Sequence, residues 1–156
     1  MSRVRRGTRL GAFLVLWAAA GCGDLDVVTA SYATIQEAAA AGAVERGVVP
    51  AGLPPSTRDI REAHDRQSTR RWGLFEFSPA EADVLRATLG SEIRFDGLRV
   101  TPPRRIEWWP LLLRGDLDAA QLTATGLQAY EAEDGELVVA VNWKQGRAYY
   151  WARQRP

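Results

Sequence analysis

The C-terminal end of this chain holds the feature that most constrains its fold. Three segments, 127–132, 137–143 and 147–152, alternate apolar and polar residues and are separated by short turns. Asp134-Gly135 lies between the first two segments, and this dipeptide between alternating runs is the strongest short hairpin signal. The pattern predicts an antiparallel β-meander, with its second turn at 144–146.

The first part of the chain mixes strand and helix signals. Strand-forming residues around 27–32 predict a first strand. Thr34 followed by Glu37 predicts a capping box, which opens a helix over 35–41 that ends at Gly42. Together with the meander, this predicts a small single α+β domain with an antiparallel sheet and two or three helices.

The middle of the chain has weaker patterns. Ser56 is a candidate N-cap for a short helix that runs to His64, followed by a polar loop over 65–70 and a strand over 71–77. Ser78-Pro79 then predicts a longer helix, which Gly90 ends. Three later segments are a broken strand over 92–100, a helical turn or docking loop over 107–113, and an irregular link over 115–125.

The N-terminus carries an export signal. Four arginines and no acid precede an apolar run over 10–22, and this run is shorter than the ~20 helical residues that cross a bilayer. A basic segment, a short apolar core and small residues are typical of a cleavable signal peptide. We therefore expect a signal over 1–21, a tether over 22–26 and the domain over 27–156.

The signal ends in Ala19-Ala20-Gly21-Cys22, which resembles the lipobox of bacterial lipoproteins. The resemblance implies that the Cys22 thiol is diacylated with palmitate-type chains and that cleavage occurs before it; two or three acyl chains hold a protein stably on a membrane. Gly23, by resemblance to enterobacterial sorting, favours the outer over the inner membrane, on the periplasmic side. The alternative is ordinary cleavage after Ala20, which leaves a free thiol.

A second resemblance covers about a third of the chain. The motifs that carry it are Ala38-Ala39-Ala40-Ala41-Gly42-Ala43, Arg46-Gly47, Leu53-Pro54-Pro55-Ser56, Asp59-Ile60, His64-Asp65, and Trp72 with Phe75 and Phe77. This region is similar to a group of exported bacterial proteins related to the YbbD head domain. The resemblance implies export and no particular activity.

The charge and the cysteine content of the chain exclude two classes of protein: basic nucleic-acid-binding proteins and disulfide-stabilised domains. Loss of the signal removes four of the 20 basic residues and none of the 19 acidic ones, so the mature chain has a formal charge of about −3. This is not the basic footprint of a nucleic-acid-binding protein. Cys22 is the one cysteine, so the fold has no internal disulfide and depends on its core.

His64, the one histidine, is the main candidate for chemistry, with Asp65 beside it. On the expected helix, Asp59, Glu62 and Asp65 share a face, whereas His64 lies roughly 200° around the helix from Glu62. A stable zinc site needs more nitrogen or sulfur ligands than the chain offers, so we expect neither metal nor cofactor. A structural role near a helix end or loop, and ligand or partner recognition, both remain open for His64.

Catalytic signals are otherwise weak. No Gly-x-Ser-x-Gly elbow or phosphate loop occurs. The carboxylates of 116–118 and 131–136 are the candidates for glycosidase chemistry, and the second group flanks an expected turn, where acids are ordinary solvated residues. We assign no catalytic residue and expect no enzymatic activity.

Aromatic residues offer a binding alternative. Alternation places Tyr149 and Trp151 on one face of the last strand and Tyr150 on the other, so one aromatic face is expected to be buried and the other is free to be exposed. Trp72, Trp108 and Trp109 are candidate ligand or partner residues. The preferred interpretation is a membrane-anchored periplasmic lipoprotein with a non-enzymatic interaction or accessory role, bound to an envelope protein or a glycan. The alternatives are a glycan or small-ligand module and, less favoured, an envelope hydrolase.

Overall fold

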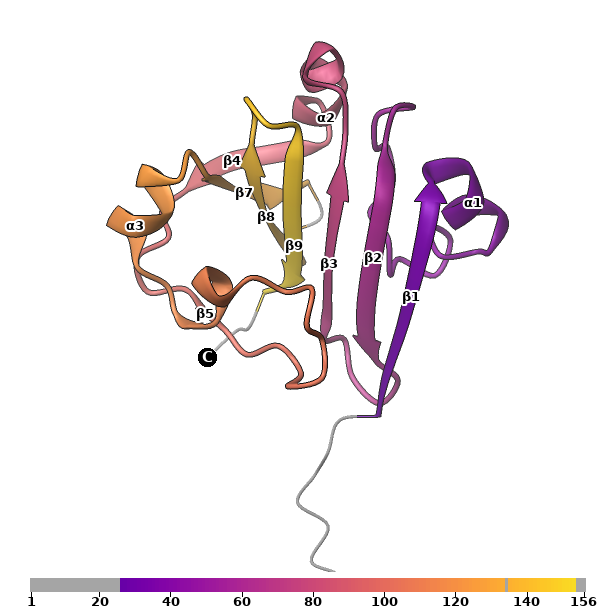
Figure 1. Cartoon of the computed structure of the whole chain (residues 1–156), viewed down its shortest axis with the longest axis horizontal. Coiled ribbons are helices and arrows are strands. Elements are labelled where there is room, and N and C mark those ends of the chain that lie inside the picture. The colour runs from indigo at the N-terminus through magenta and orange to yellow at the C-terminus, as the bar shows by residue number, and fades with distance from the viewer. Residues whose placement is uncertain (1–25, 134, 154–156) are drawn as a thin grey trace, which may run out of the picture.

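The structure, a computed structural model, describes residues 26–133 and 135–153. A seven-stranded antiparallel sheet, in the order β1-β2-β3-β9-β8-β7-β4, organises it (Figure 1). Its strands are β1 (Val27–Thr34), β2 (Arg58–Asp65), β3 (Arg71–Glu76), β4 (Leu89–Ile93), β7 (Gln128–Ala132), β8 (Leu137–Asn142) and β9 (Arg147–Ala152). The predicted small α+β domain is confirmed.

The remaining elements are short. A two-stranded sheet joins β5 (Arg99–Val100) to β6 (Gly115–Asp116). The helices are α1 (Ile35–Ala40), α2 (Ala82–Arg86) and α3 (Ala119–Ala124), with 3₁₀ turns η1 (Pro79–Glu81) and η2 (Leu111–Leu113). The predicted two or three helices are therefore present.

The C-terminal meander forms as predicted. β7 pairs with β8 and β8 pairs with β9, both antiparallel. β9 then pairs with β3, with Trp72 opposite Trp151. This contact joins the C-terminal meander to the N-terminal strands in one sheet. All six residues of β8 are buried, because the strand lies inside the sheet and both faces are covered.

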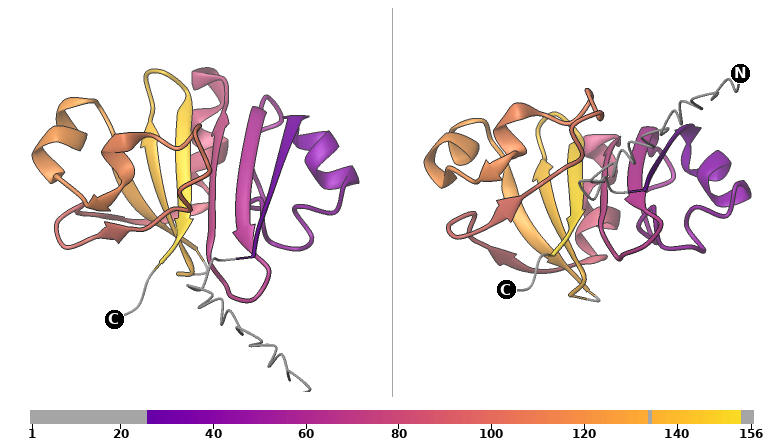
Figure 2. Two further views of the ribbon diagram at one scale, coloured as in Figure 1. Left: turned by 60° about the horizontal axis from the view of Figure 1, so that its bottom comes forward. Right: turned by 90° about the horizontal axis from the view of Figure 1, so that it is seen from below.

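Two separate apolar cores cover the two faces of the sheet. One packs α1, the loop after it and α2 against Phe75, Tyr150 and Val139. The other packs the segment between β4 and β7 against Trp72 and Trp151; this segment is coloured in pink and orange in Figure 2. Of the two alternatives for the aromatic residues of β9, the structure shows core packing, because Tyr150 and Trp151 are buried on opposite faces and Tyr149 is half-buried.

The predicted cap of α1 is confirmed. Thr34 Oγ1 accepts a hydrogen bond from the Glu37 amide at 3.2 Å. The Glu37 carboxylate accepts from the Ala33 amide at 2.8 Å, one residue earlier than in the standard capping box. Gly42 follows the helix with φ +71°, a backbone conformation that glycine adopts without strain.

The predicted helix from Ser56 to His64 is wrong, because this segment forms β2. Its residues are good helix formers, but propensity is a weak preference, and β2 gains ladder hydrogen bonds from β1 on one side and β3 on the other. Ser56 instead bonds to the start of η1: its Oγ accepts from the Ser78 amide at 2.9 Å, and its amide donates to Glu81 at 3.0 Å.

Two further predictions from the sequence differ from the structure. The helix predicted to run to Gly90 ends at Arg86, and the chain turns into β4, which pairs with β7. The link over 115–125 contains α3, whose N-cap Asp118 accepts from the Gln121 amide at 3.0 Å. At the first place, pairing of β4 with β7 outweighs the local helical pattern beyond Arg86. At the second, the Asp118 cap is a local signal that the prediction did not use.

Candidate functional site

The strand conformation of β2 brings together two residues that the helical prediction separated. Residues two apart on a strand point to the same face, so Glu62 and His64 lie side by side. Nδ1 of His64 is 2.8 Å from Oε2 of Glu62. The Glu62 side chain is 2% exposed and the His64 side chain 21% exposed. The two therefore form a buried acid–imidazole pair with one accessible end.

Burial dominates the electrostatics of this pair. Loss of solvent raises the pKa of Glu62 above its ordinary value, while the hydrogen bond and charge of His64 and the charge of Arg46 lower it. The net direction is upward, so the proton on Glu62 is held more tightly than in the unfolded chain. The carboxylate of Glu62 also contributes to raising the pKa of Tyr32 and of Tyr150.

Tyr150 packs beside the pair and is fully buried. Its hydroxyl donates to the carbonyl of Val48 at 2.9 Å, and burial raises its pKa well above the ordinary value. The ring lies over Gly73, where an added Cβ would meet the ring's Cζ at 2.1 Å. We did not predict this contact from the sequence, although a glycine inside a strand is the signal for such a close approach.

Asp65 lies on the opposite face of β2 from His64 and has a local role. Its carboxylate accepts from the Ser68 hydroxyl at 2.5 Å and from the Gln67 amide at 3.3 Å. The Ser68 bond is the main cause of the lowered pKa of Asp65. Asp65 thus organises the turn over 65–70, and the structure does not bring it together with His64.

The three candidate tryptophans are mostly in the core. Trp72 and Trp109 are buried, and Nε1 of Trp109 donates to the carbonyl of Leu113 at 2.7 Å. Trp108 is half-buried and stacks edge-on against Trp109 with ring centroids 6.0 Å apart. It lines a hollow of about 340 Å³ with Tyr32. Trp108 is therefore the member of this set that a ligand can reach.

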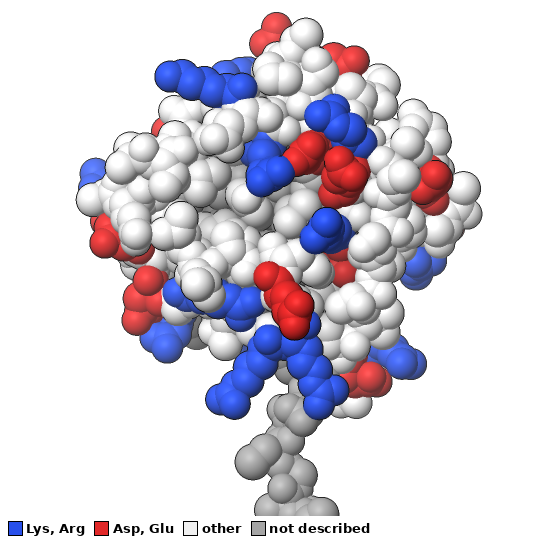
Figure 3. Space-filling view, in the orientation of Figure 1, with Lys and Arg blue, Asp and Glu red and all other residues white. Residues whose placement is uncertain are grey.

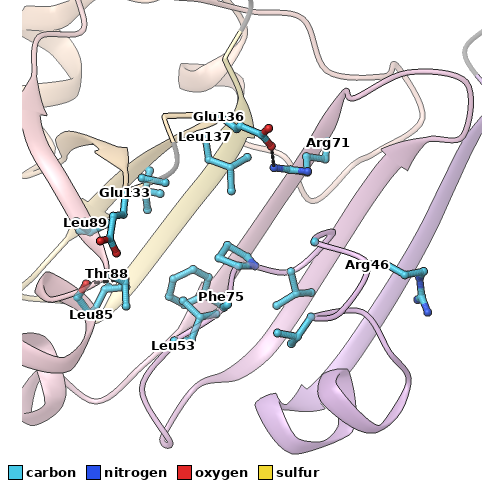
Figure 4. A pocket seen from close by; sticks show the side chains of 18 of the residues that line it. Arg46, Leu53, Arg71, Phe75, Leu85, Thr88, Leu89, Glu133, Glu136 and Leu137 are labelled. Carbon is cyan, nitrogen blue, oxygen red and sulfur yellow. Dashed lines mark hydrogen bonds and ion pairs between the residues drawn. The ribbon is translucent and has the colours of Figure 1, made fainter.

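A larger pocket lies on the same face as the Glu62–His64 pair. Its volume is about 730 Å³, and its walls come from the loop over 44–53, α2, β3 and the β7–β8 hairpin. Figure 4 shows Phe75 and Leu53 on its floor and Arg71 paired with Glu136 at its edge, with Nη2 to Oε2 at 3.1 Å. Arg71 is the cross-strand neighbour of His64, so pocket and pair adjoin.

The side-chain clusters and the surface charge of the described residues bear on what the site can bind. Within residues 26–133 and 135–153, no group of three or more His, Cys, Asp or Glu side chains is placed to hold a metal ion. The face shown in Figure 3 carries acidic and basic side chains next to one another. What the site offers is an apolar pocket, a mixed-charge rim and one acid–imidazole pair. Cys22 lies outside the described residues.

Comparison with protein families finds one match. The family model described as YbbD head domain matches residues 26–76, about a third of the chain. The matched region runs from β1 to β3 and includes Glu62, His64, Arg71 and Gly73, whereas Tyr150 lies outside it. No curated protein and no solved structure matches the chain. No helix in the described part of the chain is long and apolar enough to cross a membrane.

Proposed function

We propose that this chain is a lipid-anchored protein of the bacterial cell envelope, held by Cys22 on the periplasmic side, with the outer membrane favoured. The observation that carries the proposal is the sequence Ala-Gly-Cys at the end of a short apolar run behind four arginines. The match to the YbbD head domain family agrees with an envelope protein. β1 begins at Val27, so the tether from Cys22 is only a few residues long and the domain lies close to the membrane.

We further propose that the domain acts by binding and not by catalysis. The support is the pocket of about 730 Å³, which has the size of typical small-ligand sites. Its apolar floor and charged rim suit recognition of a ligand or of an envelope partner. A small-ligand module is thus the second candidate, and a glycan module would have to rely on Trp108. For an envelope hydrolase, the less favoured alternative, the Glu62–His64 pair offers an acid and a base.

Substitution of Cys22 tests the anchor. Cys22→Ala should abolish labelling with radioactive palmitate and move the protein from the detergent phase to the aqueous phase, or leave it uncleaved. Loss of two or three acyl chains removes the apolar area that holds the protein on the bilayer. Gly23→Ala is the matched control, because it changes the neighbouring residue and keeps the thiol. Unchanged palmitate labelling and membrane attachment of Cys22→Ala would refute the proposal.

Gly23→Asp tests the sorting part. An aspartate directly after the lipidated cysteine should keep the protein in the inner membrane, as the resemblance to enterobacterial sorting implies. Separation of the two membranes on a density gradient measures the shift, and palmitate labelling should stay unchanged. If Gly23→Asp and the unsubstituted protein are found in the same membrane fraction, Gly23 does not direct the protein to the outer membrane.

A further inference from the structure

The pocket next to Arg71 is elongated along β3. Arg71 lies at one end and Phe75 is four residues further along the strand, roughly 13 Å away at ~3.3 Å per residue. Beyond Arg71 the pocket is mostly apolar, because Leu53, Phe75 and Leu85 line it, and Glu133 lies beside Thr88 on its far wall (Figure 4). A ligand that fills this pocket therefore has an extended apolar part and one polar end.

The polar end of the pocket carries both signs of charge. The Arg71 guanidinium pairs with Glu136, but its buried Nε has no hydrogen-bond partner among the described residues. Glu133 lines the pocket on the other side, beside Thr88 and Leu85, and the Arg46 guanidinium points away from the cavity (Figure 4). An anion at this end would face the Glu136 carboxylate, and a cation would face Arg71. A head group with one charge of each sign complements this rim.

The loop over 44–53 passes close to Arg71. A Cβ at Gly47 would lie in ordinary van der Waals contact with Nη1 of Arg71, at 3.7 Å, and the φ of +69° at this position favours glycine. Arg71 stands opposite His64 in the ladder, and His64 stands opposite Val28. Two strand spacings, roughly 10 Å, therefore separate Arg71 from the beginning of β1.

We propose that this pocket binds a single-chain amphiphile whose zwitterionic head carries a phosphate and an amine, as in a lysophospholipid. The phosphate accepts hydrogen bonds from Arg71, the amine faces Glu136, and the chain lies along Phe75 and Leu53. The chemistry of binding is independent of the anchor. The membrane as the source of the ligand rests on the proposed function. With the anchor at Cys22, the Arg71 end of the pocket would lie beside the tether.

Titration with dodecylphosphocholine at submicellar concentration tests the proposal. The full lipidated chain is held in an amphipathic polymer in place of detergent, and the amide NMR signals of Gly47, Gly52 and Phe75 are followed. These signals should shift in a saturable way. Dodecyl maltoside, which has the same chain and no charge, and dodecyl sulfate, which is an anion, should each bind more weakly.

Two substitutions sharpen the test. Arg71→Gln should raise the dissociation constant for dodecylphosphocholine about tenfold, which corresponds to ~1.4 kcal/mol, because the head group loses its charged hydrogen-bond donor. Arg61→Gln is the matched control, because Arg61 is exposed on the same pair of strands and does not line this pocket. Ala51→Trp, on an exposed part of the pocket wall, should block binding and leave Arg71 in place.

Three results would overturn the proposal. The first is the absence of saturable shifts at the pocket amides. The second is tighter binding of dodecyl sulfate than of the zwitterion. The third is equal binding by Ala51→Trp and the unsubstituted protein, which decides the matter even if Arg71→Gln does not fold. A negative result in the Cys22→Ala fractionation would concern the anchor alone and would leave these titrations unaffected.

Discussion

Gly73 gives a direct test of how the sheet is packed. A Cβ at this position would lie 2.1 Å from Cζ and 2.2 Å from Oη of Tyr150, so Gly73→Ala forces a fully buried ring to move. Overpacking of this kind costs ~1–3 kcal/mol. The hydrogen bond from Tyr150 to Val48 is lost or strained, which costs a further ~1–3 kcal/mol. The lower backbone entropy of alanine in the unfolded chain offsets ~0.5–1 kcal/mol.

The net expectation is a loss of about 2–4 kcal/mol in the free energy of unfolding, measured by urea denaturation followed by circular dichroism. Gly90→Ala is the matched control, because Gly90 also lies in a strand and its added Cβ meets nothing closer than 3.4 Å. That variant should stay within ~1 kcal/mol of the unsubstituted protein. When Tyr150 is already replaced by Leu, Gly73→Ala should lower the free energy of unfolding by ~1–3 kcal/mol less than it does in the unsubstituted protein. A Gly73→Ala protein as stable as the unsubstituted one would refute the reasoning.

Three further predictions concern the hydrogen bonds of Thr34 and Trp109 and the titration of Glu62. Thr34→Ala should lower the free energy of unfolding by ~1 kcal/mol, and Thr34→Ser should restore it; equal stabilities would contradict the cap. Burial raises the pKa of Glu62 above 4.5, so its contribution to stability is greatest below the unfolded pKa and declines as the pH rises through the folded one. Glu62→Gln should therefore flatten stability against pH in urea titrations above pH 4, and an unchanged slope would contradict the raised pKa. Trp109→Phe leaves the buried Leu113 carbonyl without its donor and should cost ~1–3 kcal/mol in the same assay; a smaller loss would show that the bond is replaced.

Local patterns predict those parts of the fold that depend on interactions between residues close together in the sequence. The meander over 127–152 is an example, because its turns and alternation lie within a few residues of each other. The cap at Thr34 and Glu37 is another, since both partners lie in one helical turn. The pairing of β9 with β3 has no such local signal, and the sequence did not predict it.

The candidate site follows from contacts between distant segments. Glu62 and His64 were identified near each other in the sequence, but their pairing depends on β2 being a strand. That conformation is set by the ladders to β1 and β3, not by the helix-forming residues of the segment. The pocket has walls from four separate parts of the chain, so no single stretch of sequence reveals it.

The sequence by itself predicts an export signal that ends at Cys22, and it determined the antiparallel meander and the α+β class. These depend on composition, short motifs and the two-residue period of strands. Only the tertiary structure decided that β2 is a strand, that Tyr150 lies over Gly73, and that Arg71 borders an apolar pocket. The physical reason is that long-range pairing and burial outweigh the small free-energy differences between local conformations.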